Sequence, residues 1–432
     1  MLRLPLYQQI LVAMALPIVL KLLSGLLGFS FDKTTVFLGL NIYESFAFLG
    51  DMFLNGLKMV VVPLVLASMI CAVSGIAGRR DLGRIGGKTL AFYLLSSFAA
   101  IMVGLFFVNL LAPGIIDGEP ARDLLALSDD SAVQAKLAMV EGRGSSDLAA
   151  IFLRMLPPNI IGAAAAGQML GLITFGVLFG YFMMQVAKEK RSVLENFWQG
   201  VFETMMLITM FIMKFAPLGV LGLIGKVVMA TGFAGIKPML LFMLTVFAAL
   251  LAHTFITMPL VLKYVAKVNP WRHYQAMAPA LLTAFSTASS SGTLPLTMKC
   301  VEQNAKVSNK TAGFVLPLGA TINMDGTALY ECVAAMFIAQ AYGLELSFVT
   351  QFTIVFVALL TSIGVAGIPA ASLVAITIIL AAIGLPAEGI GLLLLTDRIL
   401  DMMRTAVNVW SDSCCAVVVA KSEGETQVLA QK

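Results

Sequence analysis

Six long apolar segments follow one another along the first part of the chain, and they constrain the fold more than any other feature. They lie near residues 9–30, 45–77, 86–113, 150–187, 194–226 and 235–266. Each can form a helix of about 20 residues, enough to cross a hydrocarbon core of about 30 Å. The chain is 59% hydrophobic and 12% charged, roughly half the charge usual in a soluble domain. The sequence therefore predicts an all-α polytopic membrane protein.

Short basic clusters follow the second, fourth and sixth of these segments. Their residues are Arg79, Arg80, Arg84 and Lys88, then Lys188, Lys190 and Arg191, then Lys263, Lys267 and Arg272. The positive-inside rule assigns these loops and both termini to the cytoplasm. The first segment lacks a signal-peptide cleavage site, so we expect it to remain as a span. The acidic segment 114–149 then falls outside as a crossover. Basic residues spread in this way predict no nucleic-acid partner.

Cysteine and histidine give no metal or disulfide pattern. The five cysteines are scattered in or beside apolar segments and predict small core side chains. The two histidines, His253 and His273, have no ligand partner at metal-binding spacing.

The hydropathy pattern changes after residue 270. Two apolar arms of about ten residues, each too short to span, flank a polar tip within 276–302, which predicts a re-entrant hairpin. A span at 311–342 is interrupted by Asn323-Met324-Asp325-Gly326-Thr327. A second hairpin is predicted at 347–385, and a charged helix follows it. Hairpin plus broken helix, then hairpin plus charged helix, is typical of the inverted repeats of secondary transporters.

The last apolar segment, 386–420, carries six polar side chains on one face. Helical geometry places them within an arc of roughly 100°; they are Asp397, Asp401, Arg404, Thr405, Asn408 and Asp412. Ionised groups in a membrane helix cost several kcal/mol each, and the three carboxylates exceed the one guanidinium. The stripe therefore predicts a site for cations together with a zwitterionic or anionic molecule. Arg404 suits a carboxylate and Asp401 an ammonium; internal pairing of Arg404 with Asp401 or Asp397 is the alternative.

Two polar interruptions predict ligand contacts nearby. At Asn323–Thr327 an unwound helix would free backbone carbonyls beside Asn and Asp oxygens, a set that suits a hard cation; a simple kink is the alternative. Ser289-Ser290-Ser291-Gly292 offers hydroxyls and N–H groups at a hairpin tip, where a carboxylate is favoured. Its alternatives are a tight polar turn or a serine nucleophile, and no base is placed beside these serines.

Two further features are weaker by themselves. Tyr93, Ser96 and Ser97 share one face of the third segment, although such side chains commonly bond helix backbone in membranes. Glu331 lies four residues after Thr327 on the same helical face, and a carboxyl in apolar surroundings can take up a proton near neutral pH. It is a candidate proton carrier, or else a carboxyl at the membrane boundary.

These motifs resemble those of the glutamate/aspartate transporter family, the dicarboxylate/amino acid:cation symporters, over nearly the whole chain. The matching motifs are Ser289 through Pro295, Asn323 through Thr327, Ala366 through Pro369 and Asp401 through Asp412. The resemblance implies a homotrimeric elevator-type transporter with eight transmembrane helices and two re-entrant hairpins. Residues 1–80 and 150–226 would form a scaffold of helices 1, 2, 4 and 5. Residues 81–113 and 227–432 would form the transport domain, with 114–149 as an extracellular loop.

The resemblance also implies the roles of individual residues. Substrate contacts would be Ser290, Thr327, the backbone of Ile368, Asp401, Arg404, Thr405 and Asn408. Three sodium sites would use Tyr93, Ser96, Ser97, Asn323 and Asp325; Gly319, Asn323, Asn408 and Asp412; and backbone around Thr321, Ser362, Ile363 and Val365. Glu331 resembles the glutamate of relatives in which this position is associated with proton co-transport and potassium counter-transport. Carboxylates at Asp401 and Asp412 favour an amino acid and sodium, and Arg404 favours aspartate or glutamate.

The chain departs from the family pattern at a few positions. Ala288 and Met402 stand where relatives carry a second arginine. Ser372 replaces a glycine beside the substrate, and Ser411 replaces another just before Asp412. Affinity and substrate size are open at these positions, as is the preference between aspartate and glutamate.

Together these features predict a sodium-coupled importer of acidic amino acids in a bacterial inner membrane, surrounded by lipid. Proton co-transport and potassium counter-transport stay open. The alternatives are a proton-coupled C4-dicarboxylate symporter and, in a different class, an anion channel. Polar residues clustered at one depth favour an occluded site over a channel. An enzyme is not expected.

Overall fold

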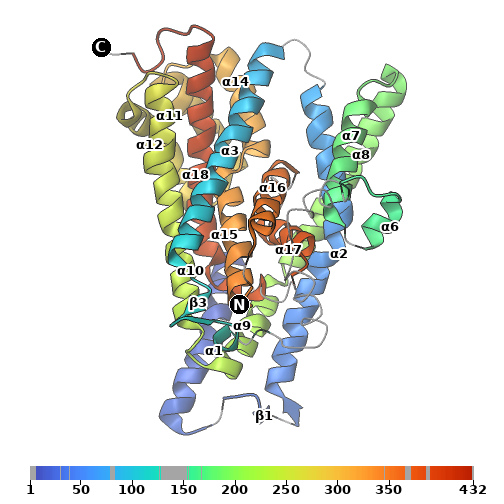
Figure 1. Ribbon diagram of the computed structural model, residues 1–432, viewed down its shortest axis with the longest axis vertical. Coiled ribbons are helices and arrows are strands. Elements are labelled where there is room, and N and C mark those ends of the chain that lie inside the picture. Colours follow the sequence, from blue (N-terminus) through green and yellow to red (C-terminus); the bar gives the residue numbers. More distant parts are fainter. Residues whose placement is uncertain are drawn as a thin grey trace.

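The apolar segments form helices, and the computed structural model of the chain is mostly helical (Figure 1). It describes residues 6–29, 31–37, 39–77, 83–125, 127, 153, 155–166, 168–344, 346–364, 371–385 and 390–430. The first half contains α1 Leu6–Leu27, α2 Ile42–Ala77, α3 Gly83–Leu111, η2 Asp123–Leu125, α6 Ile160–Ala165, α7 Met169–Met183, α8 Lys188–Met213 and α9 Ala216–Thr231. The second half contains α10 Ile236–Ala252, η3 His253–Thr257, α11 Met258–Tyr264, α12 Pro270–Thr287, α13 Ser290–Lys299, η4 Cys300–Asn304, α14 Asn309–Ile322, α15 Asp325–Ala341, α16 Phe348–Gly364, α17 Ala371–Ile383 and α18 Ile390–Ser422.

Strand structure in the described residues is confined to two short antiparallel ribbons. Strand β1 Val36–Phe37 pairs with β2 Leu40–Asn41, and β3 Ile115–Ile116 pairs with β4 Glu119–Pro120. Both ribbons lie in connections between helices, so the helices alone position the polar residues of interest.

Two continuous helical stretches of the described chain are long and apolar enough to cross a membrane, Arg84–Leu111 and Ile236–Tyr264. The segment expected as one span at 194–226 is instead two helices, α8 and α9, bent by 55° at the junction. Pro217 lies in the first turn of α9. Because proline lacks a backbone N–H, it cannot continue the hydrogen bonds of a preceding helix. The pair satisfies the length and composition of one broken span.

The interruption expected in the span at 311–342 separates α14 from α15. Asn323 is extended, with φ −94° and ψ 105°, and Met324 also leaves the helical region. The last N–H of the first helix, on Asn323, bonds to the carbonyl of Gly319, while α15 restarts with Ala328 bonded to Met324. Between these two bonds, the backbone at 323–324 has non-helical dihedral angles and separates the two helices.

Helices α12 and α13 form the first predicted hairpin. Ala288 at its tip is left-handed, with φ +49°, and the Ser289 hydroxyl accepts a hydrogen bond from Gly292 N at 3.0 Å, which caps α13. The first arm begins at Pro270 rather than near 276, because Asn269 caps α12 by accepting from Trp271 N. Helices α16 and α17 pack together as the second pair. Their connection at 365–370, with Val365 and Ile368, lies outside the described residues.

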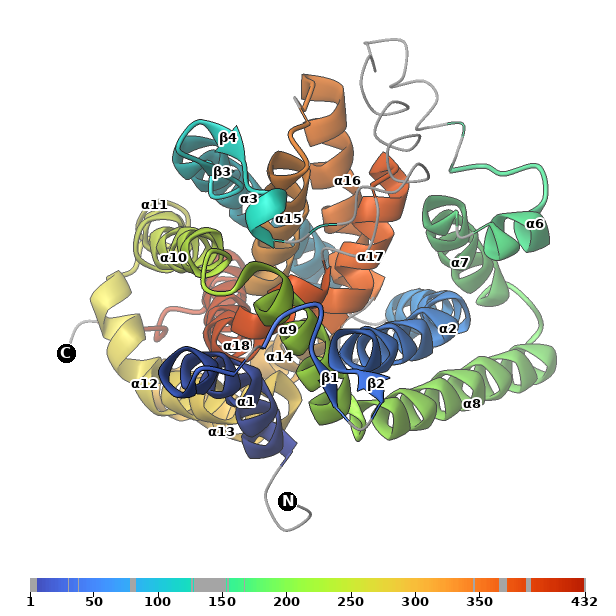
Figure 2. The same cartoon turned by 90° about the horizontal axis from the view of Figure 1, so that it is seen from below.

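The helices form two groups when the molecule is seen from one end (Figure 2). Helix α2 packs on α7, α8 and α9, whereas α18 packs on α12, α14 and α15, and α3 packs on α15 and α10. Helix α16 contacts α2, α3 and α15. The broken helix and the charged helix thus lie side by side within the second group.

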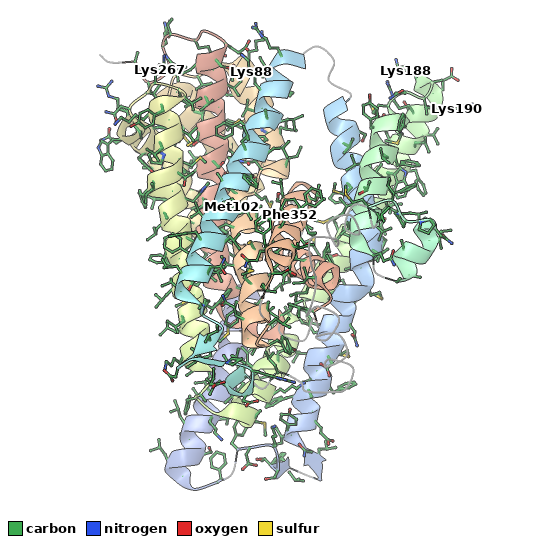
Figure 3. The ribbon with its side chains drawn as sticks, in the orientation of Figure 1. Lys88, Met102, Lys188, Lys190, Lys267 and Phe352 are labelled. Atoms are coloured by element: carbon green, nitrogen blue, oxygen red, sulfur yellow. The ribbon has the colours of Figure 1, made fainter. Side chains whose placement is uncertain are left out.

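The C-terminal segment ties several elements together at one end of the molecule. Glu423 forms ion pairs with Arg84 and Lys88 at the start of α3, and Leu429 N donates to the carbonyl of Ala305 after the first hairpin. The hydrogen bond from Lys88 holds the pKa of Glu423 below its ordinary value. Lys88, Lys188, Lys190 and Lys267 all lie at this same end, away from Met102 and Phe352 at mid-height (Figure 3).

Candidate functional site

The charged face of α18 is largely buried, and Arg404 is its most completely enclosed charge. Its side chain is 2% exposed, and Nη2 lies 3.0 Å from Oδ1 of both Asp397 and Asp401. The internal pairing weighed from the sequence is therefore real and involves both carboxylates. Asp401 stays open to a ligand, because its side chain is 39% exposed.

The pairing leaves most of the Arg404 guanidinium without an acceptor. Among the described residues, neither Nε nor Nη1 has a hydrogen-bond partner, although both are buried. The guanidinium carbon lies 4.0 Å from the centre of the Tyr330 ring, a cation–π contact that fixes its plane. A buried guanidinium with unused donors favours a ligand carboxylate, which can accept two N–H groups in one plane.

Helices α15 and α18 approach closely just above this arginine. The side chain of Asn408 accepts from Gly326 N at 2.8 Å and donates to Thr327 Oγ1 at 3.2 Å. Thr327 and Thr405 are both buried. Thus four of the predicted substrate contacts, Thr327, Arg404, Thr405 and Asn408, lie where α15 and α18 meet.

Gly326 is the residue that permits this approach. A Cβ atom there would lie 2.7 Å from the carbonyl oxygen and 3.0 Å from the Cα of Arg404. Since both are backbone atoms, they cannot rotate aside. We therefore expect Gly326→Ala to separate the two helices and to lower substrate uptake at least about fivefold, as overpacking costs about 1–3 kcal/mol.

The measurement is uptake of labelled aspartate by purified Gly326→Ala in liposomes. The matched control is Gly313→Ala in α14, where an added Cβ meets no atom within 4 Å. Equal uptake by both variants would contradict the close approach of α15 and α18.

The first predicted cation site forms where α3 crosses the break between α14 and α15. Asp325 is 0% exposed, and its Oδ1 accepts from Ser97 Oγ at 2.7 Å and from Ser96 Oγ at 3.1 Å. Ser96 Oγ also lies 3.5 Å from Asn323 Oδ1. We call Ser96, Ser97, Asn323 and Asp325 the α3 cage.

The second predicted site shares Asn323 with the first. Asn323 Nδ2 donates to Asp412 Oδ1 at 2.9 Å. A Cβ on Gly319 would lie 2.4 Å from Asp412 Oδ1 and 2.5 Å from the Tyr93 hydroxyl oxygen, so only glycine fits there. Tyr93 itself donates to the carbonyl of Val315 at 2.8 Å. The oxygens of Tyr93 and Asp412 thus meet against the α14 backbone.

These oxygen sets suit a hard monovalent cation better than a transition metal. Within the described chain, no three His, Cys, Asp or Glu side chains gather as a metal site. The oxygens come instead from hydroxyl, amide and carboxylate groups, which are typical ligands of hard cations.

Glu331 is enclosed by the helix bundle. Its side chain is 1% exposed, and Oε2 accepts from Thr361 Oγ1 of α16 at 3.1 Å. The candidate proton carrier on α15 is therefore in direct contact with the second hairpin.

The structure leaves part of the predicted site undefined. Val365 and Ile368 lie outside the described residues, whereas Thr321 belongs to α14 and Ile363 to α16. Ser362 is buried and donates to the carbonyl of Leu359. Ser290 is half-buried at the start of α13, and no hydrogen bond in the described chain joins it to α18.

Three contacts of the site were not expected from the sequence. His253, for which the sequence offered no ligand partner at metal-binding spacing, has Nε2 3.2 Å from Asp325 Oδ2. The π-helical turn η3 begins at this residue. Tyr330 stacks on Arg404, and Ser411 Oγ donates to Asp325 Oδ2 at 2.5 Å. A histidine within an apolar span was the available signal, because a polar ring there needs a partner.

Comparison with known proteins agrees with this geometry. The model of the sodium:dicarboxylate symporter family matches residues 6–422. The chain is 34% identical over 380 residues to the proton/sodium-glutamate symport protein of Geobacillus stearothermophilus, covering 87% of each chain. It is 34% identical over 375 residues to the proton/glutamate-aspartate symporter of Escherichia coli, covering 87% of this chain and 84% of that one. It is 36% identical over 415 residues to human excitatory amino acid transporter 3, covering 87% and 79%. The chain is an integral membrane protein and belongs to the sodium:dicarboxylate symporter family.

Proposed function

We propose that the protein is a secondary active symporter that imports the acidic amino acids aspartate and glutamate together with sodium. One observation carries the proposal: the enclosed Arg404 guanidinium has donors that no described residue accepts, and it lies one helical turn from the accessible carboxylate of Asp401. That pair complements a side-chain carboxylate and an ammonium on one small molecule. The names of the relatives, which include glutamate and aspartate symporters, support the same substrate class.

In this proposal, each group of the substrate has a named partner. Arg404 binds the side-chain carboxylate and Asp401 the ammonium. Thr405 and Asn408 of α18 and Thr327 of α15 line the same space. Ser290 and the backbone of Ile368 would close it from the two hairpin tips, contributing hydroxyl and amide groups to the α-carboxylate.

Sodium is the second transported species. One ion would bind in the α3 cage with Tyr93, a second at Gly319, Asn323, Asn408 and Asp412, and a third at the backbone around Thr321, Ser362, Ile363 and Val365. Asp325 and Asp412 are both buried carboxylates, and burying such a charge without a counter-ion is costly. Cation binding relieves that cost, so it favours the conformation that also binds substrate.

Transport would follow the elevator scheme. Residues 1–80 and 150–226 would form a fixed scaffold with a trimer interface, while residues 81–113 and 227–432 would move as a transport domain. The extensive packing of α2 on α7, α8 and α9 supports this division. The lysines gathered at one end of the molecule support a cytoplasmic assignment for that end (Figure 3), in a bacterial inner membrane.

The test is uptake of labelled L-aspartate into proteoliposomes under separately imposed gradients. An inward sodium gradient is expected to drive accumulation at equal internal and external pH, and replacement of external sodium by choline is expected to abolish it. Accumulation driven by a proton gradient in the absence of sodium would reject sodium coupling. Accumulation of succinate in preference to aspartate would support a C4-dicarboxylate symporter instead.

A further inference from the structure

The α3 cage is held by a second layer of hydrogen bonds that comes from α18. Ser411, fully buried, donates from Oγ to Asp325 Oδ2 at 2.5 Å and accepts from Asn323 Nδ2 at 3.0 Å. Its single hydroxyl therefore joins the two residues that flank the helix break and that provide the cage with its amide and carboxylate oxygens.

These bonds determine which way the Asn323 amide faces. Both hydrogens of Nδ2 are used, one by Ser411 Oγ and the other by Asp412 Oδ1 at 2.9 Å. The amide oxygen must then point in the opposite direction, and it lies 3.5 Å from Ser96 Oγ inside the cage. Without the Ser411 hydroxyl, one hydrogen of Nδ2 would lose its acceptor, and the amide would be less firmly oriented.

The carboxylate of Asp325 is oriented in the same manner. Oδ2 accepts a hydrogen bond from Ser411 Oγ at 2.5 Å and lies 3.2 Å from His253 Nε2. Oδ1 is directed toward Ser96 and Ser97. Ser411 and His253 thus occupy the oxygen that faces away from α3. This leaves Oδ1 as the oxygen presented to a cation.

We propose that Ser411 is a positioning residue for the coupling cation, which sets sodium affinity by orienting Asn323 Oδ1 and Asp325 Oδ1 toward the α3 cage. The inference rests on the proposed sodium symport and adds a determinant that the family pattern lacks, because a glycine at this position has no hydroxyl. Partners that orient metal ligands typically contribute about 10–100-fold to affinity. In this proposal Ser411 acts through its hydrogen bonds to Asn323 and Asp325.

The experiment compares Ser411→Ala with wild type in aspartate uptake over a range of sodium concentrations. Half-saturating sodium is expected to rise about tenfold, while the KM for aspartate at saturating sodium stays within about twofold. Lithium should support a larger fraction of the sodium-driven rate in the variant, because a looser cage discriminates less between cation sizes. A merely structural role would move neither the sodium requirement nor the lithium ratio selectively.

Ser413→Ala is the matched control. Ser413 is also fully buried on α18, but its hydroxyl donates to the carbonyl of Trp410 at 2.7 Å and lies 2.9 Å from His273 Nε2, outside the cage. It is expected to keep the wild-type sodium requirement. Ser411→Thr retains the hydroxyl, so its half-saturating sodium concentration is expected to be close to that of wild type.

Sodium-dependent thermal stabilisation of the purified variants provides a readout independent of transport. Ser411→Ala should need about tenfold more sodium than wild type for the same rise in Tm. An unchanged or lower sodium requirement in Ser411→Ala, or an equal change in Ser413→Ala, would overturn the inference while leaving sodium symport intact. If neither aspartate uptake nor the Tm of the wild-type protein depended on sodium, the proposed function and this inference would both be overturned.

Discussion

Replacement of Arg404 by cysteine is expected to lower aspartate uptake by at least about thirtyfold, and to permit uptake of small neutral amino acids such as serine. The guanidinium is the one positive side chain on the α18 stripe, and it pairs with Asp397 and Asp401. Truncating one member of a buried, hydrogen-bonded charge pair costs about 2–5 kcal/mol. Every 1.4 kcal/mol is about tenfold in affinity.

Uptake of the neutral substrate is expected because the substitution removes the guanidinium donors that only an acidic side chain can satisfy. A neutral side chain cannot satisfy the free donors of Arg404, so wild type should reject it. In Arg404→Cys those donors are gone, while Asp401 still receives the ammonium that every amino acid carries. Labelled aspartate and serine uptake at saturating sodium would measure both changes.

Two variants separate charge from geometry. Arg404→Lys keeps a positive charge but loses the planar donor set and the stacking on Tyr330, so it should recover only a small part of aspartate uptake. Arg84→Cys removes an exposed arginine, which pairs with Glu423, and should leave substrate choice unchanged. Aspartate uptake retained by Arg404→Cys would mean that another group recognises the side-chain carboxylate.

The sequence predicted those parts of the site that depend on local periodicity. The helical repeat of α18 places Asp401, Arg404 and Asn408 on one face, and the structure has one continuous helix there. The polar run beginning at Asn323 interrupts an apolar span, and the helix breaks at that residue. In both cases neighbouring residues alone determine the outcome.

Contacts between distant segments could not be obtained in this way. Ser97 and Asp325 are 228 residues apart in the chain, so their contact depends on how α3 packs on α15. The His253–Asp325 contact depends on a π-helical turn, and a single inserted residue in the helical repeat has no reliable local sequence pattern. Ser411 stood out only as a departure from the family pattern, because a serine in a helix gives no indication of its partners.

The charge balance of the site also became clearer in three dimensions. The sequence suggested two unpaired carboxylates on α18. The structure pairs Asp397 with Arg404 and places Asp412 against Asn323, while Asp325 adds a further carboxylate from α15. Asp401 also pairs with Arg404, so the two carboxylates without an arginine partner among the described residues here, Asp325 and Asp412, lie at the break between α14 and α15, beside the proposed sodium sites.

The Glu331→Gln substitution is expected to abolish net aspartate uptake while preserving exchange of external for internal aspartate. Glu331 lies on α15 between the Arg404 region and the second hairpin, where it accepts from Thr361. If Glu331 carries the proton, its side chain is neutral while the substrate crosses the membrane. Glutamine imitates this neutral state. The empty carrier must return with the proton released, and glutamine cannot release one, so the return step fails.

Exchange and net uptake can be measured in the same proteoliposomes, loaded with either unlabelled aspartate or potassium buffer. Wild-type net uptake is expected to depend on external pH and on internal potassium, whereas exchange in Glu331→Gln should depend on neither. Glu302→Gln is the control, since that carboxylate lies at the exposed end of the first hairpin and accepts from Asn309. Net uptake in Glu331→Gln with unchanged dependence on pH and potassium would exclude Glu331 as the proton carrier and would leave Thr361 with a structural contact only.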